Sequence, residues 1–102
     1  MMGNMYYDRQ GNLITLWQWA ELVKDMEYKV VAIAEIEYAR VSTVWLGLNH
    51  NFSGVGPPVI FETMIFGGEK DQWMWRWETE AEALAGHHVV VAMLMADVKH
   101  DD

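Results

Sequence analysis

The residues whose types could do chemistry flank one loop, in the stretch "WLGLNHNFSGVGPPVIFETM" of Trp45–Met64. His50 follows a first apolar string, and Glu62 lies inside a second one. A histidine can act as a general acid or base, and a carboxylate can orient it or take the proton itself. If the two strings pair as a hairpin, His50 lies near Pro58 and Glu62 lies opposite Leu46, roughly 13 Å further along the strand.

That separation excludes a direct hydrogen bond between His50 and Glu62. One hypothesis is that both side chains line one pocket and contact the same ligand. The alternative is that the histidine belongs only to the loop and that Glu62 pairs with Arg40 or Arg76 or caps a backbone group.

A second candidate site is the row "WMWRW", in which Trp73, Trp75 and Trp77 alternate with Met74 and Arg76. Such a row is typical of a core or a subunit interface. Its functional alternative is base stacking, with indole faces holding a purine while an arginine binds a phosphate. The glycines of the neighbouring loop would let its backbone approach an anion, although the loop matches no phosphate-binding motif.

Two adjacent histidines, His87 and His88, occur in an expected helix. Adjacent helical residues point about 100° apart, so the pair does not form the i, i+4 arrangement that chelates a metal. We expect a histidine on a packed helix face, bonded to a carbonyl or an acid. The sequence predicts no metal site and no cofactor.

The composition limits the range of functions. The chain has 102 residues, a net charge of −8 and no cysteine. Its length fits a single domain, residues 1–102. The negative charge argues against DNA or RNA binding, which requires cations to neutralise phosphates. The absence of cysteine excludes disulfides and thiol nucleophiles and fits a reducing cytoplasm. No apolar run appears long enough to suggest a membrane span.

The expected fold is α+β, an antiparallel meander of four to five strands with two helices packed on one face. The strands are expected over Tyr28–Glu37, Val41–Asn49, Pro58–Phe66 and Gln72–Glu78. A short N-terminal pair with a turn at Asp8–Asn12 would add a fifth. The tryptophan row is too apolar to remain in water, so we expect something to cover it, and subunit contact is the simplest explanation for so many aromatic residues.

The two expected helices begin with capping boxes. "TLWQWAELVKDM" starts with Thr15 and has Gln18 three residues later, and "TEAEALAGHHVVVAMLMADV" starts with Thr79 followed by Glu82. In each pair the first side chain caps a backbone amide of the first turn, and the second side chain bonds back to the cap.

Four strings, "YYDRQGNLITLWQWAEL", "VSTVWLGLNHNF", "PPVIFETMIFGG" and "ETEAEALAGHH", resemble a family of small uncharacterised bacteriophage and prophage proteins. The resemblance covers nearly the whole chain and carries no established activity. It implies a phage accessory protein that acts in the cytoplasm of a bacterium.

Three functions remain open. In the first, a homo-oligomer without enzymatic activity binds and sequesters a nucleotide-derived bacterial immune signal, and so acts against host defence. In the second, an enzyme cleaves such a nucleotide with His50 and Glu62. In the third, the acidic surface binds and inhibits a basic host protein. The residues expected to bind the nucleotide are Arg40, Trp45, Asn49, His50, Asn51, Phe52, Glu62, Trp73, Trp75 and Arg76.

Overall fold

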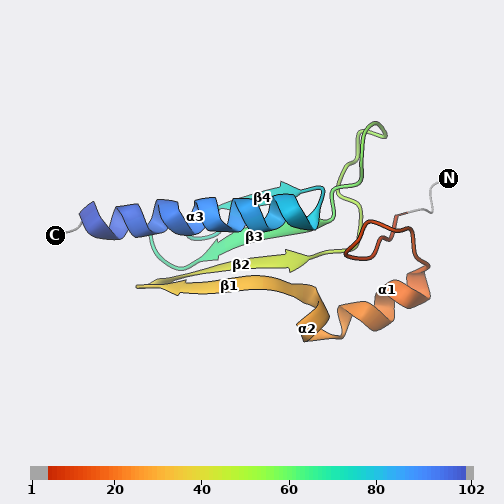
Figure 1. Ribbon diagram of the computed structural model, residues 1–102, viewed down its shortest axis with the longest axis horizontal. Helices are drawn as coiled ribbons and strands as arrows, with labels where there is room; N and C mark the ends of the chain where they lie inside the picture. The colour runs from red at the N-terminus through yellow and green to blue at the C-terminus, as the bar shows by residue number, and fades with distance from the viewer. Residues whose placement is uncertain (1–4, 101–102) are drawn as a thin grey trace.

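The computed structural model describes residues 5–100, with side chains described to residue 98. Seven elements follow one another along the chain (Figure 1): α1 (Leu16–Val23), α2 (Met26–Lys29), β1 (Val30–Ile36), β2 (Ala39–Trp45), β3 (Phe61–Phe66), β4 (Met74–Trp77) and α3 (Glu80–His100). The strands form one sheet in the order β1-β2-β3-β4, and each neighbouring pair is antiparallel. The α+β class and the four-stranded meander predicted from the sequence are therefore confirmed.

The fifth strand is not confirmed. The N-terminal segment makes only two isolated bridges, Tyr6 with Leu48 and Tyr7 with Leu13. Its predicted turn does form, since the Asp8 amide donates to the Asn12 carbonyl and Gly11 takes a positive φ of 87°. The ladder stops after one bridge on each side, so the segment is a turn attached to the end of the sheet.

The helices are arranged differently from the prediction of two helices on one face. α3 packs along one face and contacts all four strands, whereas α1 and α2 lie beyond one end of the sheet (Figure 1). The expected first helix is broken because Asp25 caps α2, its carboxylate accepting from the amides of Glu27 and Tyr28.

The first predicted capping box is confirmed. The Thr15 hydroxyl accepts from the Gln18 amide at 3.1 Å, and the Gln18 side chain accepts from the Thr15 amide at 2.9 Å. In the second box, the Thr79 hydroxyl accepts from the Glu82 amide, as expected. The Glu82 carboxylate, however, accepts from the Glu78 amide rather than from Thr79.

The core lies between α3 and the sheet, in two clusters. One contains Val41, Ile65, Val90 and Leu94, and the other contains Trp45, Ile60, Phe61 and Ala83. Trp75 packs against the first cluster and Trp77 against the second, while Trp73, at the start of the row, remains 49% exposed. α3 of the same chain therefore covers much of the tryptophan row.

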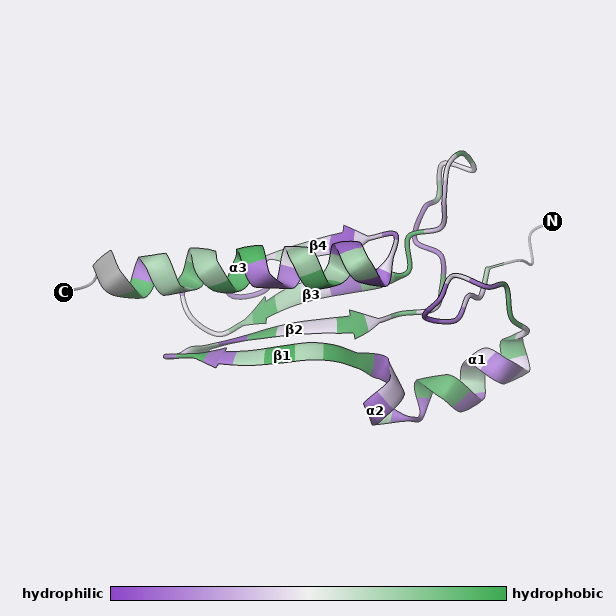
Figure 2. Cartoon of the chain, in the orientation of Figure 1, coloured by the Kyte–Doolittle hydropathy of each residue, from purple (hydrophilic) through white to green (hydrophobic). Residues whose placement is uncertain are grey.

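Apart from His87 and His88, α3 is largely apolar along its middle. No Asp, Glu, Lys or Arg occurs between Ala83 and Ala96, and Figure 2 shows hydrophobic residues along much of the helix. Contrary to the expectation from the sequence, Glu80–Val98 is long and apolar enough to cross a membrane by length and composition. In this fold one side of the helix is packed on the sheet, an arrangement consistent with a water-soluble α+β protein.

The other face of the sheet carries no helix, and we call it the open face. Its central row is Ile33, Ser42, Met64 and Met74, which are paired across the four strands. Successive strand residues point to opposite faces, so every buried residue of β2 and β3 alternates with one on the open face.

Candidate functional site

The loop between β2 and β3 begins with a bulge. The amides of Leu46 and Gly47 both donate to the Ile60 carbonyl, and the His50 amide donates to the Val59 carbonyl at 2.8 Å. The bulge consumes extra residues on one side of the hairpin. Glu62 therefore pairs with Val44. The sequence had suggested a pairing with Leu46.

His50 and its neighbouring asparagines hold the loop together. The His50 Nδ1 lies 2.8 Å from the Leu48 carbonyl, to which it must donate, and its ring packs edge-on to Phe52. The Asn49 side chain accepts from the amides of Asn51 and Val59. The Asn51 side chain donates to the carbonyls of Val55 and Pro57. These polar groups are occupied by the loop's own backbone.

Glu62 lies on the open face, where its carboxylate is 3.3 Å from Nε of Arg76. Arg40 lies on the same face and bonds to Glu35, with 2.7 Å between Nε and Oε2. Of the two partners proposed for Glu62, the structure therefore selects Arg76. The loop histidine contributes nothing to this ion pair.

The three tryptophans of the predicted site, Trp45, Trp73 and Trp75, lie on the face of the sheet that α3 covers. Trp45 is fully buried, and its Nε1 donates to the Tyr7 carbonyl, so no indole face is available for a ligand. Trp73 and Trp75 pack edge-to-face at 6.4 Å between ring centroids. The ten residues proposed for one site thus separate into three places: the loop (Asn49, His50, Asn51, Phe52), the α3 face (Trp45, Trp73, Trp75) and the open face (Arg40, Glu62, Arg76).

A groove of about 690 Å³ runs across the open face. Its lining is apolar along most of its length, with two cations and one hydroxyl among the polar groups. The lining residues are Met26, Lys29, Val30, Ile33, Arg40, Ser42, Val44, Leu46, Glu62 and Phe66. Lys29, Ser42 and Phe66 were missed from the sequence. The alternation along β2 and β3 could have placed Ser42 and Phe66 beside Arg40 and Glu62.

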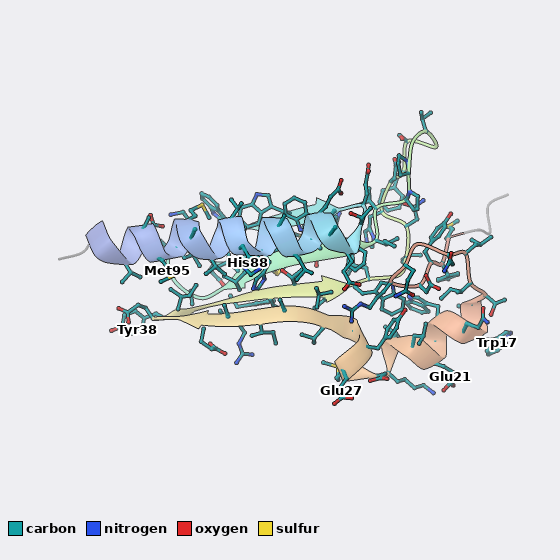
Figure 3. The ribbon with its side chains drawn as sticks, in the orientation of Figure 1. Trp17, Glu21, Glu27, Tyr38, His88 and Met95 are labelled. Carbon is teal, nitrogen blue, oxygen red and sulfur yellow. The ribbon has the colours of Figure 1, made fainter. Side chains whose placement is uncertain are left out.

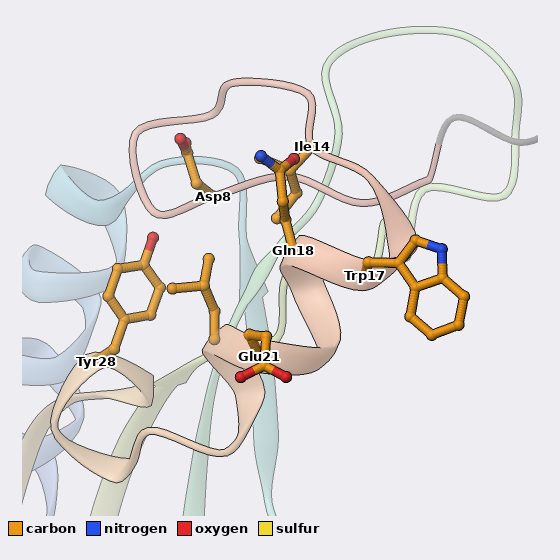
Figure 4. A pocket seen from close by; sticks show the side chains of 7 residues that line it. Asp8, Ile14, Trp17, Gln18, Glu21 and Tyr28 are labelled. Carbon is orange, nitrogen blue, oxygen red and sulfur yellow. The ribbon is translucent and has the colours of Figure 1, made fainter.

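A second hollow of about 620 Å³ lies between α1 and the N-terminal turn (Figure 4). Its polar lining includes the carboxylates of Asp8 and Glu21 and contains no cation. Asp8 Oδ1 already accepts from the amides of Gln10 and Asn12. This hollow is therefore less suited to an anionic ligand than the groove on the open face.

A chain of polar side chains crosses the core beneath α3. Trp77 Nε1 donates to Thr63 Oγ1 at 3.0 Å, the Thr63 and Thr43 hydroxyls are 2.6 Å apart, and Thr43 Oγ1 lies 2.7 Å from Nδ1 of His87. His87 is 3% exposed, and both threonines are fully buried. The expected partner of a packed histidine was a carbonyl or an acid, and the structure gives a hydroxyl instead. His88 is exposed (Figure 3).

These hydrogen bonds form a consistent chain when His87 is neutral and its Nδ1 accepts from Thr43. The Trp77 Nε1–H can only donate a hydrogen bond, so Thr63 Oγ1 accepts from it. The Thr63 hydroxyl can then donate to Thr43 Oγ1, and the Thr43 hydroxyl can donate to Nδ1 of His87. A protonated Nδ1 would have to donate to Thr43 Oγ1, and the Thr43 hydroxyl would then donate to Thr63. The Thr63 hydroxyl would no longer have Thr43 as its acceptor. Burial, together with the adjacent His88, lowers the pKa of His87 from its ordinary value of 6.5.

This lowered pKa predicts acid destabilisation. The unfolded chain takes up the proton at a higher pH than the folded chain, so the free energy of unfolding falls as the pH drops below about 6.5. The stabilising contribution of neutral His87 is complete above the pKa of His87 in the unfolded chain. It is lost as the pH falls through the pKa of His87 in the folded chain. Urea unfolding of the wild type and of His87→Asn, followed between about pH 7.5 and 5, measures the effect.

The side-chain oxygen of Asn can accept a hydrogen bond from the Thr43 hydroxyl, and Asn does not titrate. We therefore expect a smaller slope of stability against pH for His87→Asn. His88→Asn is the matched control and should reduce the slope less than His87→Asn does, because burial is the larger cause of the lowered pKa of His87 and His88 the smaller one. Equal slopes for the wild type and His87→Asn would contradict the assignment.

Within residues 5–98, whose side chains the structure describes, no three His, Asp or Glu side chains gather in a way that could hold a metal ion. The geometry instead offers an apolar groove with cations on one face and a hydrogen-bonded chain of polar side chains in the core. No protein-family model matches the chain, and comparison with curated proteins and with solved structures likewise gave no match.

Proposed function

We propose that the protein is a binding protein without catalytic activity, and that its groove on the open face takes an anionic ligand of the nucleotide class. The observation that carries this proposal is the charge of the face. It holds three of the chain's seven cationic residues, Lys29, Arg40 and Arg76, but only two of its fifteen carboxylates, Glu35 and Glu62. The face is therefore locally positive in a chain of net charge −8.

The cations of the groove are placed to bind two anionic groups. Lys29 adjoins Val30, which pairs with Val44, and Arg40 lies four residues along β2 from Val44. At about 3.4 Å per residue, the two backbone positions are about 14 Å apart. A guanidinium has five N–H donors, and Glu35 does not use all of them, so Arg40 retains donors for a phosphate. A dinucleotide is long enough to reach both ends.

The space between the cations suits a base and a sugar. Phe66 is 47% exposed and offers an aromatic ring beside the aliphatic side chains of Ile33 and Val44. The Ser42 hydroxyl lies among them and can bond to a ribose or a phosphate oxygen. Ligand pockets commonly combine such an apolar lining with a few polar groups that fix orientation.

The sequence resemblance to phage proteins adds a biological setting to this proposal. The resemblance implies an accessory protein that acts in a bacterial cytoplasm. Within that setting we propose that the ligand is a nucleotide-derived bacterial immune signal and that the protein sequesters it. The enzyme alternative is weaker, because Glu62 is paired with Arg76 on the open face while His50 is bonded within the loop.

Arg40→Gln tests the proposal by isothermal titration with cyclic dinucleotides, linear dinucleotides and ADP-ribose-type nucleotides. We expect the wild type to bind one of these classes and Arg40→Gln to bind it at least about tenfold more weakly, since a charge-assisted bond contributes about 1.5–3 kcal/mol. Chromatography of the recovered ligand should show it unchanged.

Lys24→Gln is the matched control. Lys24 is an exposed cation at the C-cap of α1 and pairs with Glu21 away from the groove, so its loss changes the net charge equally. Equal weakening by both variants would indicate general electrostatics, and a wild type that binds no member of the panel would refute the proposal. Turnover of the ligand would favour the enzyme instead.

A further inference from the structure

We propose that a second copy of this chain packs on the open face and closes the groove, so that the ligand site lies between two copies. The groove has one wall in a single chain, formed by the sheet and by Met26 and Lys29 of α2. A second copy that packed against the rim of the groove would supply the opposite wall and enclose the space.

The open face has the composition of an interface core. Its large apolar side chains are well exposed: Met26 at 63%, Ile33 at 49%, Phe66 at 47% and Met74 at 41%. Val30, Val44 and Met64 lie beside them and are only half-buried. Methionine and aromatic residues are enriched at the cores of protein interfaces. These side chains form a continuous patch across all four strands.

The charges on this face select a second copy as the occupant. In a two-fold interface the same surface must complement itself. The open face carries two ion pairs, Glu35 with Arg40 and Glu62 with Arg76, so each copy offers both signs to the other. The rest of the chain has a net charge of −9, so two copies that met through any other shared surface would bring like charges together. A strongly acidic or basic partner would leave one member of each pair unmatched.

The exposed area is consistent with such an interface. The accessible surface is 6565 Å², whereas a compact chain of this mass, 11.8 kDa, exposes about 5900 Å². The excess of roughly 650 Å² is a property of the whole molecule, including the exposed loop at residues 52–57, and it is of the same order as the ~800 Å² that each partner buries in a standard interface. The molecule is also elongated, with a radius of gyration of 15.0 Å against about 13 Å for a compact domain of this length.

Sedimentation velocity of the ligand-free protein tests the dimer independently of the ligand. We expect the wild type to sediment with twice the 11.8 kDa chain mass and Ile33→Glu to sediment as a single chain. Phe66→Glu should have the same effect. The exposed positions of both residues predict an unchanged far-ultraviolet circular dichroism spectrum, which shows that the variants are folded.

Val89→Glu is the matched control, because Val89 is, like Ile33, an exposed aliphatic residue. It is 69% exposed and lies on the outer side of α3. It should leave the dimer intact. A monomeric wild type, a dimer that survives Ile33→Glu and Phe66→Glu, or a dimer lost only in Val89→Glu would each overturn the proposal.

The absence of cysteine allows a second test by cross-linking. Ser42 lies in the central row of the open face, between Ile33 and Met64, so Ser42→Cys would bring two thiols near the two-fold axis. A short bis-maleimide should join the two chains of this variant within minutes and should not join Ala85→Cys, an exposed position on α3. A dimer that binds no nucleotide would refute the proposed ligand alone, and nucleotide binding by a monomer would refute the dimer alone.

Discussion

Gly86→Ala is expected to lower the free energy of unfolding by about 2–3 kcal/mol, the cost of overpacking a filled core. In an ordinary helix the same change would stabilise by about 1 kcal/mol, because alanine is the better helix former. Here a Cβ on Gly86 would bring three atoms of the Trp77 ring within 3.0 Å. That ring cannot easily move, because its Nε1 is bonded to Thr63 and its body packs against the core. Urea unfolding measures the change.

A double-mutant cycle tests the cause. Trp77→Phe removes part of the ring, so Gly86→Ala should cost much less in that background than in the wild type. Ala85→Gly, at the neighbouring exposed position, should destabilise by about 0.5–1 kcal/mol from helix propensity alone. A stabilising Gly86→Ala would show that α3 does not approach β4 this closely.

Thr63→Val is expected to destabilise by about 2–3 kcal/mol, although it preserves the shape of the side chain. Thr63 Oγ1 is the acceptor for Trp77 Nε1 and the partner of Thr43 Oγ1, and both threonines are fully buried. Valine would leave the buried indole N–H without its acceptor, and an unsatisfied buried donor costs about 1–3 kcal/mol. Thermal or urea unfolding near pH 7.5, where His87 is neutral, measures the loss.

Thr63→Ser is the matched control for this prediction. Serine keeps the hydroxyl and removes only a methyl group, so its cost should be about 1 kcal/mol. Similar costs for serine and valine would mean that packing, and not the hydrogen-bonded chain, makes this position important. The near-ultraviolet circular dichroism of the tryptophans reports whether the Trp77 ring has moved.

Both predictions concern the layer between α3 and the sheet, which is separate from the groove. Substitutions there should change stability while leaving ligand affinity and the dimer unchanged in the folded fraction. Substitutions at Ile33, Arg40 and Phe66 should do the opposite. This separation follows from the alternation of side chains across the sheet, because successive residues of one strand belong to different faces.

The sequence by itself determined the local structure. The alternation of apolar residues, the turn residues between the apolar strings and the capping residues at Thr15 and Thr79 predicted the four strands of the meander and the starts of both long helices. These signals act between residues close in the chain, so no tertiary contact is needed to express them. The break at Asp25 was missed because its capping role competes with a helical pattern that continues through it.

Only the tertiary structure decided which face of the sheet is covered. The two-residue period of a strand assigns Trp75 and Arg76 to opposite faces of the sheet. Both faces carry large apolar residues, so the sequence pattern does not predict the face on which α3 docks. Once α3 lies over Trp75 and Trp77, the tryptophan row becomes core, and the opposite row of Ile33, Ser42 and Met64 becomes the exposed one. The predicted single site was divided for the same reason, because its residues came from both faces and from the loop.

The buried chain from Trp77 to His87 was equally invisible in the sequence. Thr43, Thr63 and His87 are 20 and 44 residues apart along the chain in their bonded pairs. Their meeting depends on the strand register of β2 and β3 and on the docking position of α3 together. Local patterns fix the period of each element, whereas the register and docking between elements are set by long-range packing, and the candidate site of this protein depends on the latter.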